Sequence, residues 1–377
     1  IPLDSFKYAR TTTVNIIKKK IKLNQTDELF NRELTVKLPT VNRQIPLFIL
    51  FRALGVESDK EILEYILYDL NTEKSKLFIE FLRPSLESVG AIYSQDMALS
   101  YLNVIQGRSM DALKLTIIDE VFPHTGDEYK MKAYYLGYVV LKLLHVHFNI
   151  DSPTDRDSFE FKRVDLSGFL LANLFRENFK QFQRDAKVEI DREYRVNESI
   201  YYDEAYMNII NDDNFYKIFN QNVITNSFSK AFKIGTILNK KGLIQSLNRL
   251  SNLGTISHLR RINIYVETGS QVVIGQRKLH PTQYGIICPV ETPDGGNIGI
   301  KKHLTITGHI TFGCDPQPII ELLLQLGLVK LQNLKPIHLI NKCKVFINGC
   351  WLGIINEPIK VVTMLRLLRR NSYINIF

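Results

Sequence analysis

The segment RKLHPTQYGIICPVETPDGGNIGI, Arg277–Ile300, is the least regular stretch of this sequence. Around its Glu-Thr-Pro-Asp-Gly centre, prolines and glycines gather at Gly285, Pro289, Pro293, Gly295, Gly296 and Gly299. Proline fixes the backbone angle φ and glycine frees it, so such a run specifies a rigid, irregular path rather than a helix or a strand.

Positive charge is concentrated around this segment. The formal net charge is +9, and between Ser227 and His303 eleven basic residues are opposed by only three acidic ones. Apolar, glycine and proline positions interrupt the basic residues, which is unlike the single polar stripe of a solvated face. Concentrated charge of this kind indicates a polyanionic partner. A solvated strand or helix end accounts for the second basic cluster, Lys18–Lys20 with Lys22.

The size and composition are those of a globular protein. The 377 residues allow two or three domains, and 45% are hydrophobic and 23% charged. No apolar run reaches the ~18 residues that span a bilayer, so we expect no membrane partner, and the longest run, Tyr134–Phe148, predicts a buried helix. The chain lacks an initial methionine, a signal peptide and a C-terminal cap or tail, so we expect it to be an internal section of a longer protein.

The four cysteines, at positions 288, 314, 343 and 350, form no Cys-x-x-Cys pair. This spacing supports neither a zinc ribbon nor a disulfide framework. We interpret Cys343 and Cys350, at an expected hairpin, as a pair of buried thiols. The pattern suits a reducing intracellular compartment, whether nucleus, cytoplasm, virus factory or virion.

Hydrophobic periodicity predicts a mixture of strands and helices. Alternation over residues 1–44 predicts strands joined by turns. In IPLFILFRALG, residues 45–55, apolar residues recur at helical spacing until the glycine, and Ser58 with Glu61 predicts a capping box for the next helix. Helical patterning then dominates to about Asn149, with glycines as breaks at Gly90, Gly107 and Gly126.

The second half of the chain is patterned differently. A helix resumes over residues 166–190, and strand-like and mixed patterns follow from about Ile306. The Asn-Gly of KVFINGCWLGII, residues 344–355, predicts a hairpin, and residues 358–370 predict an amphipathic helix. We therefore expect an α+β, multidomain fold.

The polar loop after Asn149 contains clustered carboxylates at Asp151, Asp155 and Asp157. Their spacing lacks the glycine and the terminal glutamate of a calcium loop, so structural loop chemistry is favoured over a metal site. The basic neighbours expected for these carboxylates are Arg156, Lys162 and Arg163.

His145 and His147 are spaced as on a strand or at the end of a loop. No set of cysteine or carboxylate partners lies near them in the sequence, so we expect them to be packed rather than to bind a metal.

The motifs of a self-contained active site are missing from the sequence. It contains no G-x-x-x-x-G-K-[ST] phosphate loop, no G-x-S-x-G elbow, no H-E-x-x-H and no aspartate-rich run that would hold two magnesium ions. Judged by spacing alone, the chain is a basic binding scaffold. We expect no catalytic residue and no metal ligand within it.

Two strings carry a resemblance to a known family. GLIQSLNRLSNLGTISHLRRIN, Gly242–Asn263, followed by RKLHPTQYGIICPVETPDGGNIGIKKHL, residues 277–304, resembles the fork region of the second-largest subunit of multisubunit DNA-directed RNA polymerases. Earlier and later stretches resemble other parts of that subunit in the same order. The resemblance implies a lobe-like domain over 1–160, a protrusion-return helical segment over 161–226, a fork-like region over 227–305 and a small α/β external-like domain over 306–377.

The resemblance implies a share in template-directed RNA synthesis. In this family the catalytic Mg²⁺ ions are held mainly by aspartates of the largest subunit, so this chain would position template DNA, nascent RNA and ribonucleoside triphosphates. The expected partners are the largest subunit and smaller assembly subunits. The resemblance places nucleic-acid contacts at Gln245, Arg249, His258, Arg260, Arg261, Arg277, Asn297 and Lys301, and an addition-site loop at Glu291, Asp294 and Gly295. For each arginine, contact with nucleic acid and support of the fold are equally expected.

Some positions depart from the family pattern. Asp294 stands where glutamate is usual, which shortens the carboxylate's reach, and Gln283 stands where histidine is common. Two segments resembling mobile fork loops, about Ser229–Lys241 and Tyr265–Gly275, are expected to contact the edges of the DNA bubble, although the second lacks the usual Gly-Arg-Asp-Gly tip.

Two other function classes are alternatives to a polymerase subunit. A non-catalytic nucleic-acid-binding scaffold derived from the polymerase subunit would share the basic surface. An unrelated α/β enzyme with a basic cleft would require a local acid–base or nucleophile group, and the sequence offers none.

Overall fold

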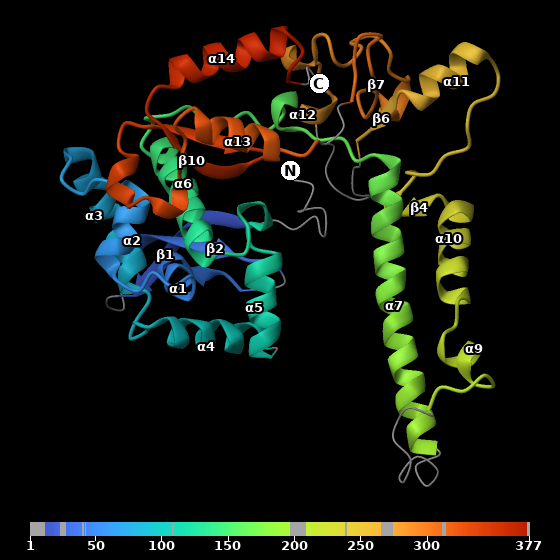
Figure 1. Ribbon diagram of the computed structural model, residues 1–377, viewed down its shortest axis with the longest axis horizontal. Coiled ribbons are helices and arrows are strands. Elements are labelled where there is room, and N and C mark those ends of the chain that lie inside the picture. Colours follow the sequence, from blue (N-terminus) through green and yellow to red (C-terminus); the bar gives the residue numbers. More distant parts are fainter. Residues whose placement is uncertain are drawn as a thin grey trace. The chain divides into compact units, whose positions relative to one another are not determined.

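A computed structural model describes residues 12–22, 28–39, 41, 43–107, 109–196, 209–237, 240–264, 274–310 and 314–374. Helices and small antiparallel sheets alternate along the chain, so the expected α+β class is confirmed (Figure 1). Contacts divide the chain into two compact units. Unit 1 comprises Ile1–Pro153 and Thr311–Phe377, and unit 2 comprises Thr154–Ile310. The four-part division expected from the sequence is finer and stays a prediction.

Unit 1 begins with a three-stranded antiparallel sheet in the order β1-β2-β3. Its strands are β1 (Thr13–Lys22), β2 (Glu28–Lys37) and β3 (Ile45–Pro46). The strands predicted near the N-terminus are thus confirmed. Leu34 and Val36 of β2 are fully buried, which anchors the sheet on the hydrophobic core of the unit.

The helices that follow share this core. They are α1 (Leu47–Ala53), α2 (Asp59–Leu67), α3 (Glu73–Glu87), α4 (Gln95–Gln106), α5 (Met110–Asp119) and α6 (Tyr129–His147), with the 3-10 turn η2 (Pro123–Thr125) before α6. Gly55 has a φ of 86° just after α1, and the other three glycines predicted as breaks also have positive φ. The predicted capping box is wrong: Ser58 is the N-cap of α2, but its side chain makes no capping bond. The first turn is held instead by Asp59, whose carboxylate pairs with buried Arg52.

The C-terminal part of unit 1 completes the same core. Its elements are α13 (Gln317–Gln325), β8 (Val329–Lys330), η7 (Leu331–Asn333), η8 (Pro336–Leu339), β9 (Cys343–Ile347), β10 (Cys350–Ile355) and α14 (Pro358–Arg370). The small sheet has the order β8-β10-β9. Trp351 on β10 is 1% exposed and packs with the side chains of α6, and the Tyr134 hydroxyl donates to the Leu334 carbonyl at 2.7 Å.

The β9–β10 hairpin confirms one prediction and corrects another. Asn348 and Gly349 both have positive φ, 50° and 83°, as a two-residue hairpin turn requires. Cys343 is exposed and Cys350 half-buried, and they lie opposite Ile355 and Ile347 respectively. The interpretation as a pair of buried thiols is therefore wrong, because the two residues sit at different ends of the hairpin.

The two histidines near residue 147 are packed, as expected, but on a helix rather than a strand or loop. Both lie in the last turn of α6, and their rings pack against Phe78 and Phe81. His145 also lies beside one carboxylate, with its Nδ1 3.3 Å from Asp151 Oδ2, which is a single partner rather than a set of ligands. Asp151 pairs with Lys142 as well, at 3.2 Å, and not with the expected Arg156, Lys162 or Arg163.

Unit 2 contains a long helix and a set of short elements. They are η3 (Phe159–Phe161), α7 (Ser167–Val196), α9 (Phe215–Ile218), α10 (Asn222–Ile234), β4 (Thr236–Ile237), β5 (Lys240–Lys241), α11 (Asn252–Leu259), β6 (Arg261–Asn263), α12 (Ile274–Arg277), η5 (Pro281–Gln283), η6 (Gly295–Asn297) and β7 (Lys301–His303). Helix α10 runs alongside α7 (Figure 1). Leu174 of α7, Ala231 of α10 and Ile237 of β4 form a small core.

None of the described helices combines the length and the apolar character that a membrane span requires. All four cysteines carry free thiols.

Candidate nucleic-acid interface

Strands β6 and β7 form the frame of the candidate site. They pair antiparallel, with Arg261 opposite His303. Helix α11 leads directly into β6 and begins at Ser251, whose side-chain oxygen accepts a hydrogen bond from the Gly254 N–H at 3.0 Å. The frame therefore places the predicted basic residues of α11 and β6 beside those of β7, which lie far away in the sequence.

His258 connects α11 to the segment before it. The Asn248 N–H donates to His258 Nδ1 at 3.0 Å, so this nitrogen carries no proton. The proton is on Nε2, which donates to Gln245 Oε1 at 3.1 Å, and the Gln245 amide in turn donates to the Gly242 carbonyl at 2.8 Å. His258 is therefore neutral, and two predicted site residues meet in one chain of hydrogen bonds.

Arg260 supports the backbone of the fork-like region. Its guanidinium donates to the Thr305 carbonyl and, at 3.3 Å, to the Gly308 carbonyl. Both acceptors lie just after β7. Arg260 therefore fastens the segment after β7 to the end of α11.

Arg261 acts through a buried histidine. Its Nε donates to His303 Nε2 at 3.1 Å, and His303 Nδ1 donates to the Glu291 carbonyl at 2.9 Å. Because Nε2 accepts the arginine's bond, His303 is neutral, and the 3.9 Å between this nitrogen and the Glu291 carboxylate is not an ion pair. The same carboxylate accepts a hydrogen bond from the Ser257 hydroxyl. Glu291 is thus tied to α11 and to β7.

Arg277 fixes the glycine-rich loop that follows it. Its Nη1 donates to the carbonyls of Gly296 at 2.7 Å and Ile298 at 3.1 Å. The backbone at Gly299 has a φ of 69°, and a Cβ there would lie 2.3 Å from the Arg277 carbonyl oxygen. The loop therefore requires glycine at this position both for its conformation and for its close approach to Arg277.

Thr292 closes the base of the same loop. Its hydroxyl donates to the Lys301 carbonyl at 2.9 Å and accepts a bond from the Gly299 N–H at 2.9 Å. The Glu-Thr-Pro-Asp-Gly sequence therefore follows a path that is fixed at both ends. Gly295, at the start of η6, has a φ of 72°, and a Cβ there would meet no atom within 4 Å, so only its conformation calls for glycine.

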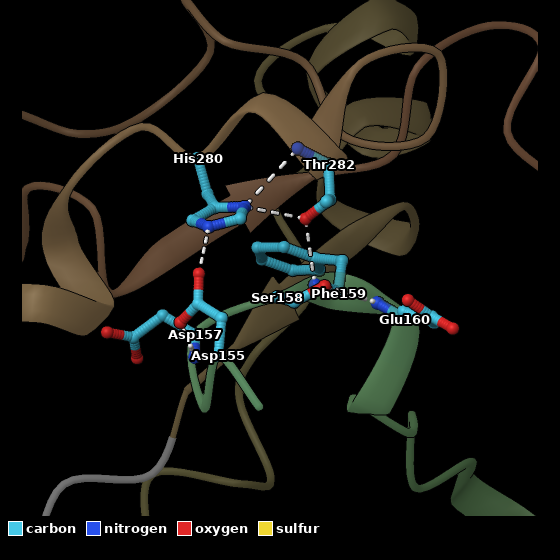
Figure 2. Close-up of polar contacts among 7 residues, drawn as sticks. All are labelled: Asp155, Asp157, Ser158, Phe159, Glu160, His280 and Thr282. Atoms are coloured by element: carbon cyan, nitrogen blue, oxygen red, sulfur yellow. Dashed lines mark hydrogen bonds and ion pairs between the residues drawn. The ribbon is translucent and has the colours of Figure 1, made fainter. Parts of the chain in front are cut away.

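A polar cluster that the sequence did not predict attaches the segment around residue 157 to this region (Figure 2). Asp155 Oδ2 lies 2.7 Å from His280 Nε2, and His280 Nδ1 lies 2.7 Å from the Thr282 hydroxyl. The Thr282 oxygen also accepts the Phe159 N–H at 2.9 Å. An acid–histidine–hydroxyl series resembles that of nucleophilic enzymes. Here the hydroxyl is held by bonds on both sides, so we interpret the cluster as a clasp between η3 and η5.

Two charged side chains lie in or beside the clasp, Asp155 and Lys302. A hydrogen bond from the Asp157 N–H, together with His280, holds the pKa of Asp155 below its usual value. Lys302 is 5% exposed, and its Nζ lies 5.2 Å from the centre of the Phe159 ring. Lys302 therefore packs inside the region, and burial lowers its pKa. No local sequence pattern connects Asp155 with His280, since they are 125 residues apart.

Four of the predicted site residues have side chains that take no part in these internal hydrogen bonds. Arg249, Asp294 and Asn297 are exposed and Lys301 is half-exposed. Within the part of the chain that the structure describes, none of these four side chains has a hydrogen-bond or ion-pair partner. The structure thus separates predicted residues that hold the frame from residues that are available to a ligand.

Of the two expected fork loops, the structure describes most of the first and little of the second. The described part of Ser229–Lys241 is mostly regular, since α10 continues to Ile234 and β4 pairs with β5. Residues 265–273 of the second loop lie outside the described residues. The described residues contain no group of three or more histidine, cysteine or acidic side chains arranged to hold a metal ion.

Comparison with known proteins covers most of the chain. Residues 4–165 match the family model of RNA polymerase Rpb2, domain 2, and residues 245–310 match RNA polymerase Rpb2, domain 3. The DNA-directed RNA polymerase II subunit RPB2 of Encephalitozoon cuniculi is 34% identical, over 89% of this chain and 29% of that protein. The Schizosaccharomyces pombe subunit of the same name is 33% identical, over 88% and 28%. The DNA-directed RNA polymerase subunit Rpo2 of Saccharolobus solfataricus is 29% identical, over 90% and 30%.

The chain spans less than a third of the length of these relatives. The two family models match it in the order in which the domains are numbered, and together they cover more than half of its residues. These relatives do not favour the derived non-catalytic scaffold. By these matches the chain belongs to the family of second-largest subunits of DNA-directed RNA polymerases.

Proposed function

We propose that this chain, within an assembled DNA-directed RNA polymerase, positions template DNA, the RNA–DNA hybrid and the incoming ribonucleoside triphosphate for template-directed RNA synthesis. Its partners are the largest subunit and smaller assembly subunits. The family resemblance and the relatives support this proposal. The surface concerned is formed by α11 with the residues just before it from Arg249, by β6 and β7, and by the loop over residues 290–299.

One observation carries the proposal. Arg277 donates to the carbonyls on both sides of Asn297, so the loop is rigid while the Asn297 side chain is exposed. Lys301 follows the same loop at the start of β7 and has no partner among the described residues. Rigid backbone that carries free polar groups is the arrangement that positions a phosphodiester chain without reorganisation on binding.

The predicted residues divide between two roles in this proposal. Arg249, Asn297 and Lys301 contact nucleic acid, because their side chains are available. Gln245, His258, Arg260, Arg261, Arg277 and Glu291 are positioning residues, because each is engaged in bonds that fix the frame. Asp294 and Gly295 form the exposed tip of the addition-site loop.

Catalytic metal is assigned to another chain. We propose that Mg²⁺ is held by the largest subunit and supplies the charge stabilisation of phosphoryl transfer. The residues of this chain hold the nucleic acid in register beside that centre. The four-part domain division and a reducing intracellular compartment, compatible with four free thiols, belong to the same proposal.

The proposal is tested in polymerase assembled from subunits that include this chain. Arg249→Ala and Lys301→Ala are each expected to shorten the lifetime of elongation complexes severalfold. Each is also expected to reduce the slope of log affinity against log salt by about one, because each removes one phosphate contact. The measurement is complex lifetime and primer extension over a salt series.

The matched control is Lys187→Ala, an exposed lysine on α7 of the same unit. It should leave lifetime and salt slope at the parental values. If Arg249→Ala and Lys301→Ala behave like this control, the assigned contact surface is wrong. If the parental assembly does not extend a primer, the polymerase role itself is wrong.

A further inference from the structure

Unit 1 contains a cavity of about 480 Å³ that none of the roles above uses. The end of α2, the middle of α6 and the segment between η8 and β9 surround it. Tyr68, Asp69, Asn341, Lys342 and Lys344 are among the residues that line it. All of them belong to unit 1, where the core of the unit fixes their surroundings.

Lys344 faces aromatic rings but no oxygen acceptor. Its Nζ lies 5.0, 5.7 and 5.8 Å from the ring centres of Tyr68, Tyr138 and Trp351. Among the described residues, no carboxylate or carbonyl oxygen accepts a hydrogen bond from this ammonium. Burial, and nearby Lys142, lower the pKa of Lys344, which reflects a poorly solvated charge. The aromatic cage holds the cation in place and leaves its three N–H donors available.

Tyr68 presents a second unmatched donor. The residue is 7% exposed, and its hydroxyl is buried without a hydrogen-bond partner among the described residues. Burial, with a smaller contribution from Tyr138, raises the pKa of Tyr68, so the hydroxyl keeps its proton. A buried hydroxyl without a partner is rare because it gives up its bonds to water and gains nothing in exchange.

The backbone that presents Tyr68 is strained. Its φ and ψ are 65° and −44°, and the Asp69 N–H bonds to the Leu67 carbonyl at 2.8 Å. This is a γ-turn with positive φ at its centre, which is uncommon for a bulky residue. Asn341, on the opposite segment, also has positive φ, at 54°. Strain of this kind persists where the surrounding structure or a ligand requires it.

We propose that this cavity binds a small oxyanion, a carboxylate or a phosphate group, whose oxygens accept hydrogen bonds from Lys344 Nζ and the Tyr68 hydroxyl. Lys342 adds a second positive charge at the rim, against the single carboxylate of Asp69. The cavity is large enough for such a group and its water. The residues of this site belong to unit 1, whereas those of the candidate nucleic-acid interface belong to unit 2.

The fluorescence of Trp351 provides an intrinsic probe of anion binding at this site. Trp351 is the only tryptophan in the sequence, and its ring belongs to the cage around Lys344. The 377-residue chain is titrated with sodium phosphate, and separately with sodium acetate, at an ionic strength held constant with sodium chloride. A saturable change in tryptophan fluorescence, absent when chloride alone is varied, is expected for at least one of the two anions. A response to phosphate alone assigns a phosphate site, and a response to acetate includes carboxylates.

Two variants separate the site from its surroundings. Lys344→Met keeps the aliphatic stem and removes the charge, and it should abolish the saturable response. Tyr68→Phe removes one oxygen atom, and it should weaken the apparent affinity about three- to tenfold, as expected for one hydrogen bond. Because that oxygen has no hydrogen-bond partner among the described residues, Tyr68→Phe should also leave the melting temperature of the protein without added anion unchanged or raise it.

The matched control is Lys360→Met, an exposed lysine of the same unit on α14, which should titrate like the parent. Circular dichroism establishes that each variant is folded, and Tyr68→Phe alone decides the matter if Lys344→Met fails to fold. The proposal is overturned if neither anion gives a response beyond that of chloride. It is equally overturned if a folded Lys344→Met, or Tyr68→Phe, retains the parental response.

Discussion

Arginines in the fork-like region show why residue type alone does not decide function. From the sequence, contact with nucleic acid and support of the fold are equally expected for Arg260, Arg261 and Arg277. The structure gives each of them an internal acceptor, two backbone carbonyls for Arg260 and for Arg277 and the buried His303 for Arg261. Guanidinium groups suit this work because one planar fork can satisfy several carbonyls at once.

The close approach of Gly299 to Arg277 gives a prediction about stability. In Gly299→Ala the added Cβ would lie 2.3 Å from a backbone oxygen at a φ of 69°, so neighbouring backbone must move. We expect a loss of about 2–4 kcal/mol in the free energy of unfolding, measured by chemical denaturation. Gly296→Ala, where φ is not positive and no atom lies within 4 Å of the added Cβ, should change it by less than ~0.5 kcal/mol. Equal effects of the two substitutions would contradict the close approach.

His124 gives a prediction about pH. Burial, and the charge of nearby Lys132, lower its pKa from 6.5 to about 4. Between these two pKa values the unfolded chain binds a proton at His124 that the folded chain does not bind. The contribution of His124 to the free energy of unfolding is therefore fully present above pH 6.5 and is lost as the pH falls toward 4. The loss at pH 5 is on the order of 2 kcal/mol.

The measurement is the urea midpoint at pH 7 and at pH 5. The difference between the two should be smaller in His124→Phe, which keeps an aromatic ring against Tyr135 and cannot titrate. An unchanged pH dependence in this variant would show that other groups govern it.

At the scale of elements, the clasp between η3 and η5 depends on one hydroxyl. Thr282→Val removes the acceptor for the Phe159 N–H and the partner of His280 Nδ1. We expect hydrogen exchange at the Phe159 amide to speed up about tenfold, corresponding to about 1–2 kcal/mol for the lost bonds. Thr154→Val, an exposed threonine just before the clasp, should leave that exchange rate unchanged. Unchanged exchange in Thr282→Val would show that the clasp does not hold η3.

The sequence predicted those helices and turns that are determined by residues close to one another in the chain. The helix that Gly55 ends, the long α7 and the Asn348–Gly349 hairpin all follow from spacing and turn residues within a few positions. Register irregularity is different. The register shift between Trp351 and Gly353 was not predicted, and Trp351 there packs in a core most of whose other members lie far away in the sequence.

Predictions were wrong where the side-chain partner differs from the one that the local pattern suggests. Ser58 has the expected N-cap position without the expected capping bond, and the neighbouring Asp59 is engaged by Arg52. In the candidate site the sequence predicted which residues are present. It did not predict which of their side chains make internal hydrogen bonds and which have no partner among the described residues. That division depends on partners such as His303 and the Gly296 carbonyl, which lie tens of residues away.

At the scale of the whole molecule, the positive charge is only partly available. Of the basic residues gathered in the fork-like region, Lys302 lies against a ring, and Arg260, Arg261 and Arg277 are bonded internally. Net charge therefore overstates the number of phosphate contacts that the surface can make. The salt dependence of nucleic-acid binding should follow the free side chains and not the total.

Unit 1 is formed by two segments that are far apart in the sequence, and this affects how the protein folds during synthesis on the ribosome. Tyr134 must await the carbonyl of Leu334, which is synthesised 200 residues later. At about 5–20 residues per second, this wait lasts on the order of 10–40 s. For that time the apolar face of the nascent chain around α6 stays exposed to water. Molecular chaperones that bind such faces can therefore bind this chain for longer than they could bind a domain formed by one continuous segment.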